Sequence, residues 1–144
     1  MPSVDLLDFA ARVVVAIVFL TLVAALSFGA RRLASTRRAR VLATPSDPEL
    51  ATGRPTILYF HGDRCSDCVV QERELDALLS AHPEIAIRAD HAPSPLSARF
   101  GVLTVPTTVV LDGGGKAHAV NYGLARGDTL RRQLATLRPL EETA

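Results

Sequence analysis

Residues 56–68 read TILYFHGDRCSDC. The first part, Thr56–Phe60, is a short apolar run, and this predicts a strand that is buried on both faces. Cys65 and Cys68 follow the run, and they are the only cysteines of the chain. Two thiols at this spacing, between a strand and a helix, indicate a pair that forms and breaks a disulfide.

A helix is predicted over residues 66–81, directly after the first cysteine. Its apolar residues recur at helical spacing as Cys68, Leu75, Leu78 and Leu79, and Pro83 ends the pattern. Because this helix begins at the dithiol, the Cys65 sulfur is expected near unpaired backbone N–H groups and the positive end of the helix dipole. Both favour a thiolate over a thiol.

Charged residues beside the thiols act in opposite directions. Arg64 favours a thiolate, whereas Asp63 and Asp67 oppose it, so the net shift of the thiol pKa does not follow from the sequence. Asp67 is interpreted first as a cap of the helix and only second as a modulator of the thiol. We expect Cys65 to attack a substrate disulfide, and Cys68, which is expected to be more buried, to resolve the mixed disulfide.

The rest of this segment alternates between strand and helix signals, which is typical of an α/β domain. We expect further strands over 84–89, 107–111 and 116–121, a short helix over 93–100, and a terminal helix capped by Asp128 in which Leu130, Leu134 and Leu137 share one face before Pro139. The resulting order, β-α-β-(α)-β-β-α, predicts one sheet flanked by helices. Gly113–Gly115 is interpreted as a hairpin turn, since no phosphate-loop Lys-Ser/Thr follows it.

The segment 56–137 resembles a thioredoxin-like domain in its Cys-x-x-Cys after the first strand and in the sequence Val105-Pro106-Thr107 before the hairpin. The resemblance implies that Pro106 is cis and faces the dithiol, which leaves the backbone of Val105 free to pair with a substrate strand. Val105, Pro106 and Thr107 are therefore candidate substrate-binding residues. Gly123 matches a glycine of the same family pattern.

The chain also departs from the family at several positions. Thioredoxins usually have Trp-Cys-Gly-Pro-Cys, whereas residues 64–68 read RCSDC and the chain has no tryptophan. The residues between the cysteines tune the reduction potential, so its value does not transfer. Tyr59 stands where the family keeps a buried acid, and Arg73 where many members have proline. Tyr59, Arg64 and Asp67 are candidate modulators of the thiol pKa.

The N-terminal part contains an uncharged, mostly apolar run over residues 13–30, which is long enough to cross a bilayer as a helix. A cleaved signal peptide is the main alternative, and a buried soluble helix is a third. Asp5 and Asp8 precede the run and no cleavage signature follows it, so we expect an uncleaved transmembrane helix after a flank over 1–12.

Positive charge is unevenly distributed around this run. Arg12 alone precedes it, whereas five arginines follow it: Arg31, Arg32, Arg37, Arg38 and Arg40. Short basic flanks favour the cytoplasmic side, so we expect the C-terminal part to face the cytosol. The cluster is also a contact for anionic lipid head groups. Because it has no interleaved aromatic residues, we expect no nucleic-acid partner.

A length of 144 residues allows one compact domain. We expect a basic juxtamembrane segment and linker over residues 31–54, because residues 41–54 are rich in turn formers. The domain is expected over 55–140, with a tail over 141–144.

Together these features predict a single-pass protein of the cell membrane that reduces or exchanges protein disulfides without a cofactor or metal. Its expected partners are a disulfide-bearing protein, the bilayer, and a reductant such as a thioredoxin reductase or a low-molecular-weight thiol. Two alternatives stay open. One is a non-catalytic adaptor or metal-binding module, in which His61 and His91 are the nearest additional ligands. The other is the reverse membrane orientation.

Overall fold

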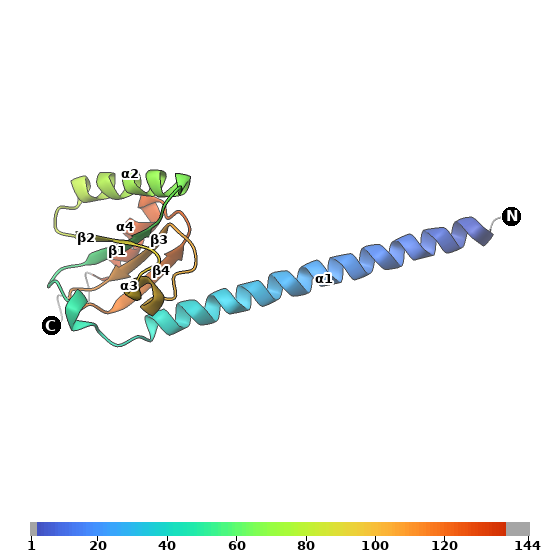
Figure 1. Ribbon diagram of the computed structural model, residues 1–144, viewed down its shortest axis with the longest axis horizontal. Coiled ribbons are helices and arrows are strands. Elements are labelled where there is room, and N and C mark those ends of the chain that lie inside the picture. The colour runs from blue at the N-terminus through green and yellow to red at the C-terminus, as the bar shows by residue number, and fades with distance from the viewer. Residues whose placement is uncertain (1–2, 138–144) are drawn as a thin grey trace. The chain divides into compact units, whose positions relative to one another are not determined.

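The computed structural model describes the backbone of residues 3–137 and the side chains of residues 9–137 (Figure 1). The chain divides into two units, Met1–Arg37 and Arg38–Ala144. Pro139 and the tail over 141–144, about which the sequence makes predictions, lie outside the described residues.

The described residues of the N-terminal unit belong to one continuous helix, α1 (Ser3–Leu42), of 40 residues. It contains the predicted span 13–30 and continues beyond it, because residues 31–42 are mostly good helix formers and include neither glycine nor proline. Residues Phe9–Leu42 are long and apolar enough to cross a membrane, and none of the most apolar window is buried. The helix is thus a candidate membrane anchor, and a signal sequence has the same properties.

The second unit is built on a four-stranded mixed sheet in the order β2-β1-β3-β4. The central pair is β1 (Thr56–His61) and β3 (Thr107–Leu111), which run antiparallel. β2 (Ala86–His91) lies parallel to β1, with Ile57 opposite Ile87, and β4 (Ala117–Tyr122) runs antiparallel to β3. The parallel pair requires a crossover, which α2 (Ser66–Ala81) supplies.

Helices cover both faces of the sheet (Figure 1). α2 and α4 (Gly127–Ala135) pack on the face to which Ile57 and Tyr59 point. On the opposite face, Leu58 and Phe60 pack with residues from α3 (Pro95–Arg99) and from the end of α1. Successive side chains of β1 therefore enter two separate cores, which confirms the prediction that this strand is buried on both faces.

The predicted element order is confirmed, and the bounds of α2 and β3 agree with the predicted ranges. One prediction for α2 is wrong, because Leu79 is 39% exposed. Gln71 is buried instead, and Cys68, Gln71, Leu75 and Leu78 form the inner stripe of the helix.

The predicted cap of α4 is also wrong. The N-cap residue is Arg126, and Asp128 lies in the first turn and pairs with Arg131. The carboxylate of Glu74, on α2, accepts the N–H of Gly127 at 2.9 Å. A group from a distant helix thus satisfies this helix start, in place of a local cap.

The expected linker contributes to the second unit. Val41, at the end of α1, and Leu50, in the 3-10 helix η1 (Pro48–Leu50), are buried in the core beside α3. Asp47 is buried too; its side chain caps η1 and pairs with Arg99. Single apolar residues in a polar stretch form no periodic pattern, so the sequence did not reveal this packing.

Candidate active site

The dithiol lies where β1 passes into α2. Between His61 and Ser66 the chain reverses through a short loop, and Arg64 in that loop has a left-handed φ of 53°. Cys65 itself is the N-cap residue of α2, and its Sγ accepts the N–H of Cys68 at 3.1 Å. Asp67, predicted as the cap, instead lies exposed in the first turn.

Cys65 and Cys68 are joined by a disulfide, with Cα atoms 5.2 Å apart. Cys65 is partly exposed, whereas Cys68 is only 4% exposed, as the sequence predicted. The Cys65 sulfur lies at the start of a 16-residue helix, where backbone N–H groups and the helix dipole favour a negative charge. After reduction, the more accessible sulfur is thus the one best placed to be a thiolate.

The loop before β3 lies beside the dithiol loop. A Cβ added to Gly62 would be 3.1 Å from Cγ2 of Val105, so glycine allows the two loops to pack closely. The Val105–Pro106 peptide bond is cis. Within the described residues, the backbone N–H and C=O of Val105 make no hydrogen bond. The backbone of Val105 is thus unpaired beside the dithiol loop.

The other residues of the family pattern have structural contacts. Thr107 is fully buried in β3, and its hydroxyl donates to the carbonyl of Thr104 at 2.8 Å. The hydroxyl group of Thr107 therefore already has a hydrogen-bond partner within the fold. Gly123 has a φ of 85°, and its N–H donates to the carbonyl of Pro106 at 2.8 Å. It therefore holds the end of β4 against the loop that contains Val105.

Tyr59 lies beneath the start of α2 and is 3% exposed. Its hydroxyl donates to the carbonyl of Cys68 at 3.2 Å and lies 3.3 Å from Oε1 of Glu72. Burial, followed by the negative charge and hydrogen bond of Glu72, raises the pKa of Tyr59 to about 12. At neutral pH this group is a phenol that donates hydrogen bonds, and it is no general base.

An open surface pocket surrounds the dithiol. Its lining includes both cysteines, together with His61, Gly62, Asp63, Arg64, Ser66, Val69 and Glu72. Glu72 did not stand out in the sequence, although its spacing of four residues from Cys68 on a helix was a usable signal. Of the candidate modulators, Arg64 lines this pocket, and Tyr59 contacts the backbone of Cys68.

A row of rings runs from Tyr59 to the neighbouring strand. The rings of Tyr59 and His61 have centroids 5.5 Å apart, and those of His61 and His91 are 5.2 Å apart. His91 Nε2 lies 3.2 Å from Oδ1 of Asp63. In the part of the chain that the structure describes, no three His, Cys, Asp or Glu residues form a group that could hold a metal.

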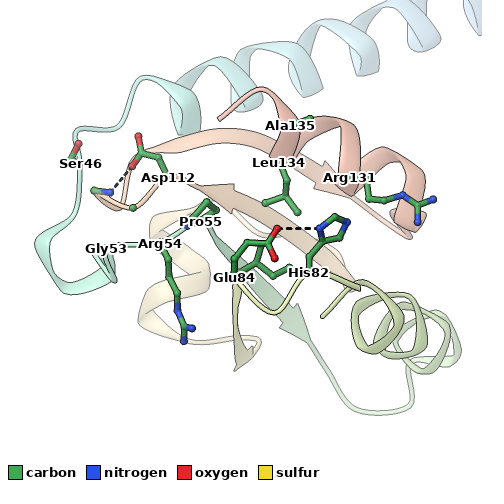
Figure 2. Close-up of a pocket in the computed structure, with 13 residues that line it drawn as sticks. Ser46, Gly53, Arg54, Pro55, His82, Glu84, Asp112, Arg131, Leu134 and Ala135 are labelled. Carbon is green, nitrogen blue, oxygen red and sulfur yellow. Dashed lines mark hydrogen bonds and ion pairs between the residues drawn. The ribbon is translucent and has the colours of Figure 1, made fainter. Parts of the chain in front are cut away.

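A cavity of about 890 Å³, larger than the dithiol pocket, lies elsewhere (Figure 2). It lies beside Pro55, just before β1, and Asp112, just after β3, whereas the dithiol follows the other end of β1. His82 and Glu84 form a hydrogen bond at its edge (Figure 2). This cavity shares no lining residue with the dithiol pocket.

Comparison with known proteins identifies the fold. Neither a protein-family model nor a curated protein matches this chain. Among solved structures it is similar to an uncharacterized thioredoxin-like protein from Clostridium perfringens, with 29% identity over 60% of this chain and 72% of that one and a TM-score of 0.53.

Two further structures agree with this result. Thioredoxin of Fasciola hepatica is 22% identical over 60% of this chain and 84% of that one, with a TM-score of 0.52. The exposed lipoprotein thioredoxin Etrx1 of Streptococcus pneumoniae is 17% identical over 60% and 87%, with a TM-score of 0.55. The second unit therefore has a thioredoxin-like fold, as the sequence predicted.

Proposed function

We propose that this protein is a membrane-anchored thiol-disulfide oxidoreductase that reduces or exchanges protein disulfides. The observation that carries the proposal is the position of Cys65. Its sulfur caps α2, accepts the N–H of Cys68 and is partly exposed, while Cys68 lies buried behind it. A thiolate stabilised at a helix start and accessible to solvent is the nucleophile that disulfide exchange requires.

The reaction proceeds in two exchanges. The Cys65 thiolate attacks one sulfur of the substrate disulfide and releases the other as a thiolate. Cys68 then attacks the Cys65 sulfur, which forms the intramolecular disulfide and releases the second substrate sulfur as a thiolate, while the Cys68 thiol gives up its one proton. The unpaired backbone of Val105, beside the cis Pro106, binds the substrate strand during these steps. A reductase or a low-molecular-weight thiol then restores the dithiol.

Thiol trapping tests the assignment of the two cysteines. We expect the full chain in detergent to reduce insulin, Cys65→Ser to be inactive, and Cys68→Ser to accumulate a mixed disulfide through Cys65. Wild-type protein with both thiols alkylated is the control. An inactive wild-type protein, or the absence of any adduct on Cys68→Ser, would contradict the proposal. Stoichiometric zinc in protein purified without oxygen would instead support the metal-binding alternative.

The membrane part of the proposal rests on α1 and its arginines. Residues Phe9–Leu42 are long and apolar enough to cross a membrane, and the basic residues follow the apolar run. This distribution of charge supports our proposal that the domain faces the cytosol. A thiol reagent that does not cross membranes tests this in intact cells. We expect labelling of Cys65 only after the cells are lysed. Labelling from outside would reverse the orientation and require an oxidising compartment.

A further inference from the structure

The exchange proposed above leaves one proton without an acceptor. Cys68 is 4% exposed, and its thiol must lose a proton as it attacks the Cys65 sulfur of the mixed disulfide. Bulk water has poor access to this sulfur. A side chain that faces both Cys68 and solvent is needed to take up the proton.

Glu72 meets this requirement. It lies one helical turn after Cys68 on α2, and residues four apart on a helix are neighbours on the same face. Both residues line the pocket around the dithiol, and Glu72 is exposed, so a proton that it accepts can leave to water. The other carboxylate in the lining, Asp63, pairs with His91, and its side chain is 91% exposed.

Tyr59 holds the carboxylate of Glu72 at this position. Its hydroxyl contacts both the Cys68 carbonyl and Oε1 of Glu72, but a phenol has only one proton to donate. That proton is shared between the two acceptors when Glu72 is ionised, and when Glu72 is protonated the carboxyl group can instead donate to the phenol oxygen. This network therefore fits the protonated form of Glu72 as well as the ionised form.

We propose that Glu72 accepts the proton of Cys68 during the resolving step, directly or through one water, and that Tyr59 positions it. This role rests on the proposed function. The carboxylate takes the proton as the Cys68 sulfur bonds to the Cys65 sulfur and the substrate leaves as a thiolate. Glu72 then returns the proton to that thiolate, which is the stronger base, and is ionised again.

The two exchanges can be followed separately. The reduced full chain, in detergent, is mixed with one equivalent of an aromatic disulfide such as dithiobis(nitrobenzoate). The first release of thionitrobenzoate reports attack by Cys65, and the second reports attack by Cys68 on the mixed disulfide. Both phases are followed from about pH 5 to about pH 9. His61, Asp63 and Arg64 are the other titratable or charged side chains that line this pocket, and all of the variants compared retain them.

We expect Glu72→Gln, which keeps the size of the side chain, to leave the first phase unchanged and to slow the second phase by roughly tenfold or more near pH 7. The difference shrinks at high pH, where hydroxide takes the proton. Tyr59→Phe keeps the carboxylate without its anchor, so it slows the second phase less. Asp76→Asn, which removes an exposed carboxylate from the same helix, is the control and keeps wild-type rates.

The sign of the effect distinguishes proton transfer from simple electrostatics. If Glu72 acted only through its charge, its removal would favour the Cys68 thiolate and accelerate the second phase. An unchanged or faster second phase in Glu72→Gln would therefore overturn this inference and leave the proposed function intact. A wild-type protein that lacks either phase would overturn the proposed function, and with it the role of Glu72.

Discussion

At the turn after β3, the backbone of Gly115 lies against the segment that precedes β1. Its φ is 78°, and its carbonyl accepts the N–H of Asp47 at 3.3 Å. A glycine is needed here for two separate reasons, the left-handed backbone and the lack of space for a Cβ. Gly123 has a similar φ of 85° but open space around it. Substitution by alanine at the two positions therefore distinguishes the loss of stability caused by a steric clash from the loss caused by the backbone conformation.

We expect Gly115→Ala to lower the free energy of unfolding by about 3 kcal/mol or more, because its Cβ would lie 2.3 Å from the carbonyl oxygen of Asp47. Gly123→Ala, the control, should cost only about 1 kcal/mol. Urea unfolding followed by tyrosine fluorescence measures both, since the chain has two tyrosines, Tyr59 and Tyr122, and no tryptophan. An equal decrease in the free energy of unfolding for the two variants would show that a local shift of the backbone relieves the clash at residue 115.

A second prediction at this scale concerns Asp112. Burial acts to raise the pKa of this carboxyl, but the backbone N–H groups of Lys116 and Gly114, together with His118, outweigh it and lower the pKa below 3.8. The folded state thus favours the ionised form. Its contribution to stability is present above the unfolded value and is lost as the pH falls through the folded pKa.

We therefore expect Asp112→Asn to destabilise the protein most at pH values above 3.8, and the difference from wild type to shrink as the pH is lowered below that value. Other carboxylates affect both proteins equally and cancel in the difference. Urea unfolding at a series of pH values measures this difference in the free energy of unfolding. A difference that does not change with pH would mean that the charge of Asp112 contributes nothing.

At the scale of elements, α2 connects the dithiol to the rest of the fold. Its N-terminus carries Cys65, and its middle holds the loop between β4 and α4. The side-chain amide of Gln71 donates to the carbonyl of Ala125 at 3.0 Å and accepts its N–H at 2.7 Å. Glu74 accepts the N–H of Gly127 one turn later. A polar pair on an otherwise apolar interface thus sets the position of α4 relative to α2.

We expect Gln71→Met, which has a similar size, to lower the free energy of unfolding by about 2–4 kcal/mol, because it leaves the buried N–H and carbonyl of Ala125 without partners. Arg73→Met, on the exposed face of the same helix, should change stability by less than about 0.5 kcal/mol. Urea unfolding followed by tyrosine fluorescence compares the stabilities of the two variants. A neutral Gln71→Met would show that water or a local shift satisfies the loop.

At the scale of the whole molecule, the thioredoxin-like unit includes residues that precede its first strand. Val41 and Leu50 are buried in the core on the α3 side of the sheet, and Asp47 pairs with Arg99. The segment from Arg38 to the start of β1 is therefore an integral part of the unit, in addition to connecting it to the rest of α1.

We expect a fragment that begins at Arg38 to unfold cooperatively and one that begins at Pro55 to be several kcal/mol less stable. Burial of Val41 and Leu50 contributes about 1.5–3 kcal/mol each, and the shorter fragment also exposes the apolar surface that they cover. Thermal unfolding of the two fragments measures the difference. Equal transition temperatures would show that residues 38–54 only connect the two units.

Much of the fold could be predicted from local patterns. The apolar run, the strand before the dithiol, the helix over 66–81 and the strand over 107–111 each depend on residues close together in the chain, so periodicity and end signals suffice. The position of Cys65 at a helix start follows from the same local reasoning. These features give the element order and the chemistry of the candidate site.

Contacts between distant parts of the chain determined the rest. Gln71 forms hydrogen bonds with Ala125, which lies 54 positions away in the chain, and Arg99 pairs with Asp47, which lies 52 positions away. Tyr59, on β1, contacts Glu72, on α2. No local pattern reports such pairs, because the burial of a polar side chain is favourable only when its partner is in place. For this reason the sequence placed two thiols at a helix start, with Glu72 one turn after Cys68, whereas the tertiary structure provided the buried phenol that contacts Cys68 and Glu72.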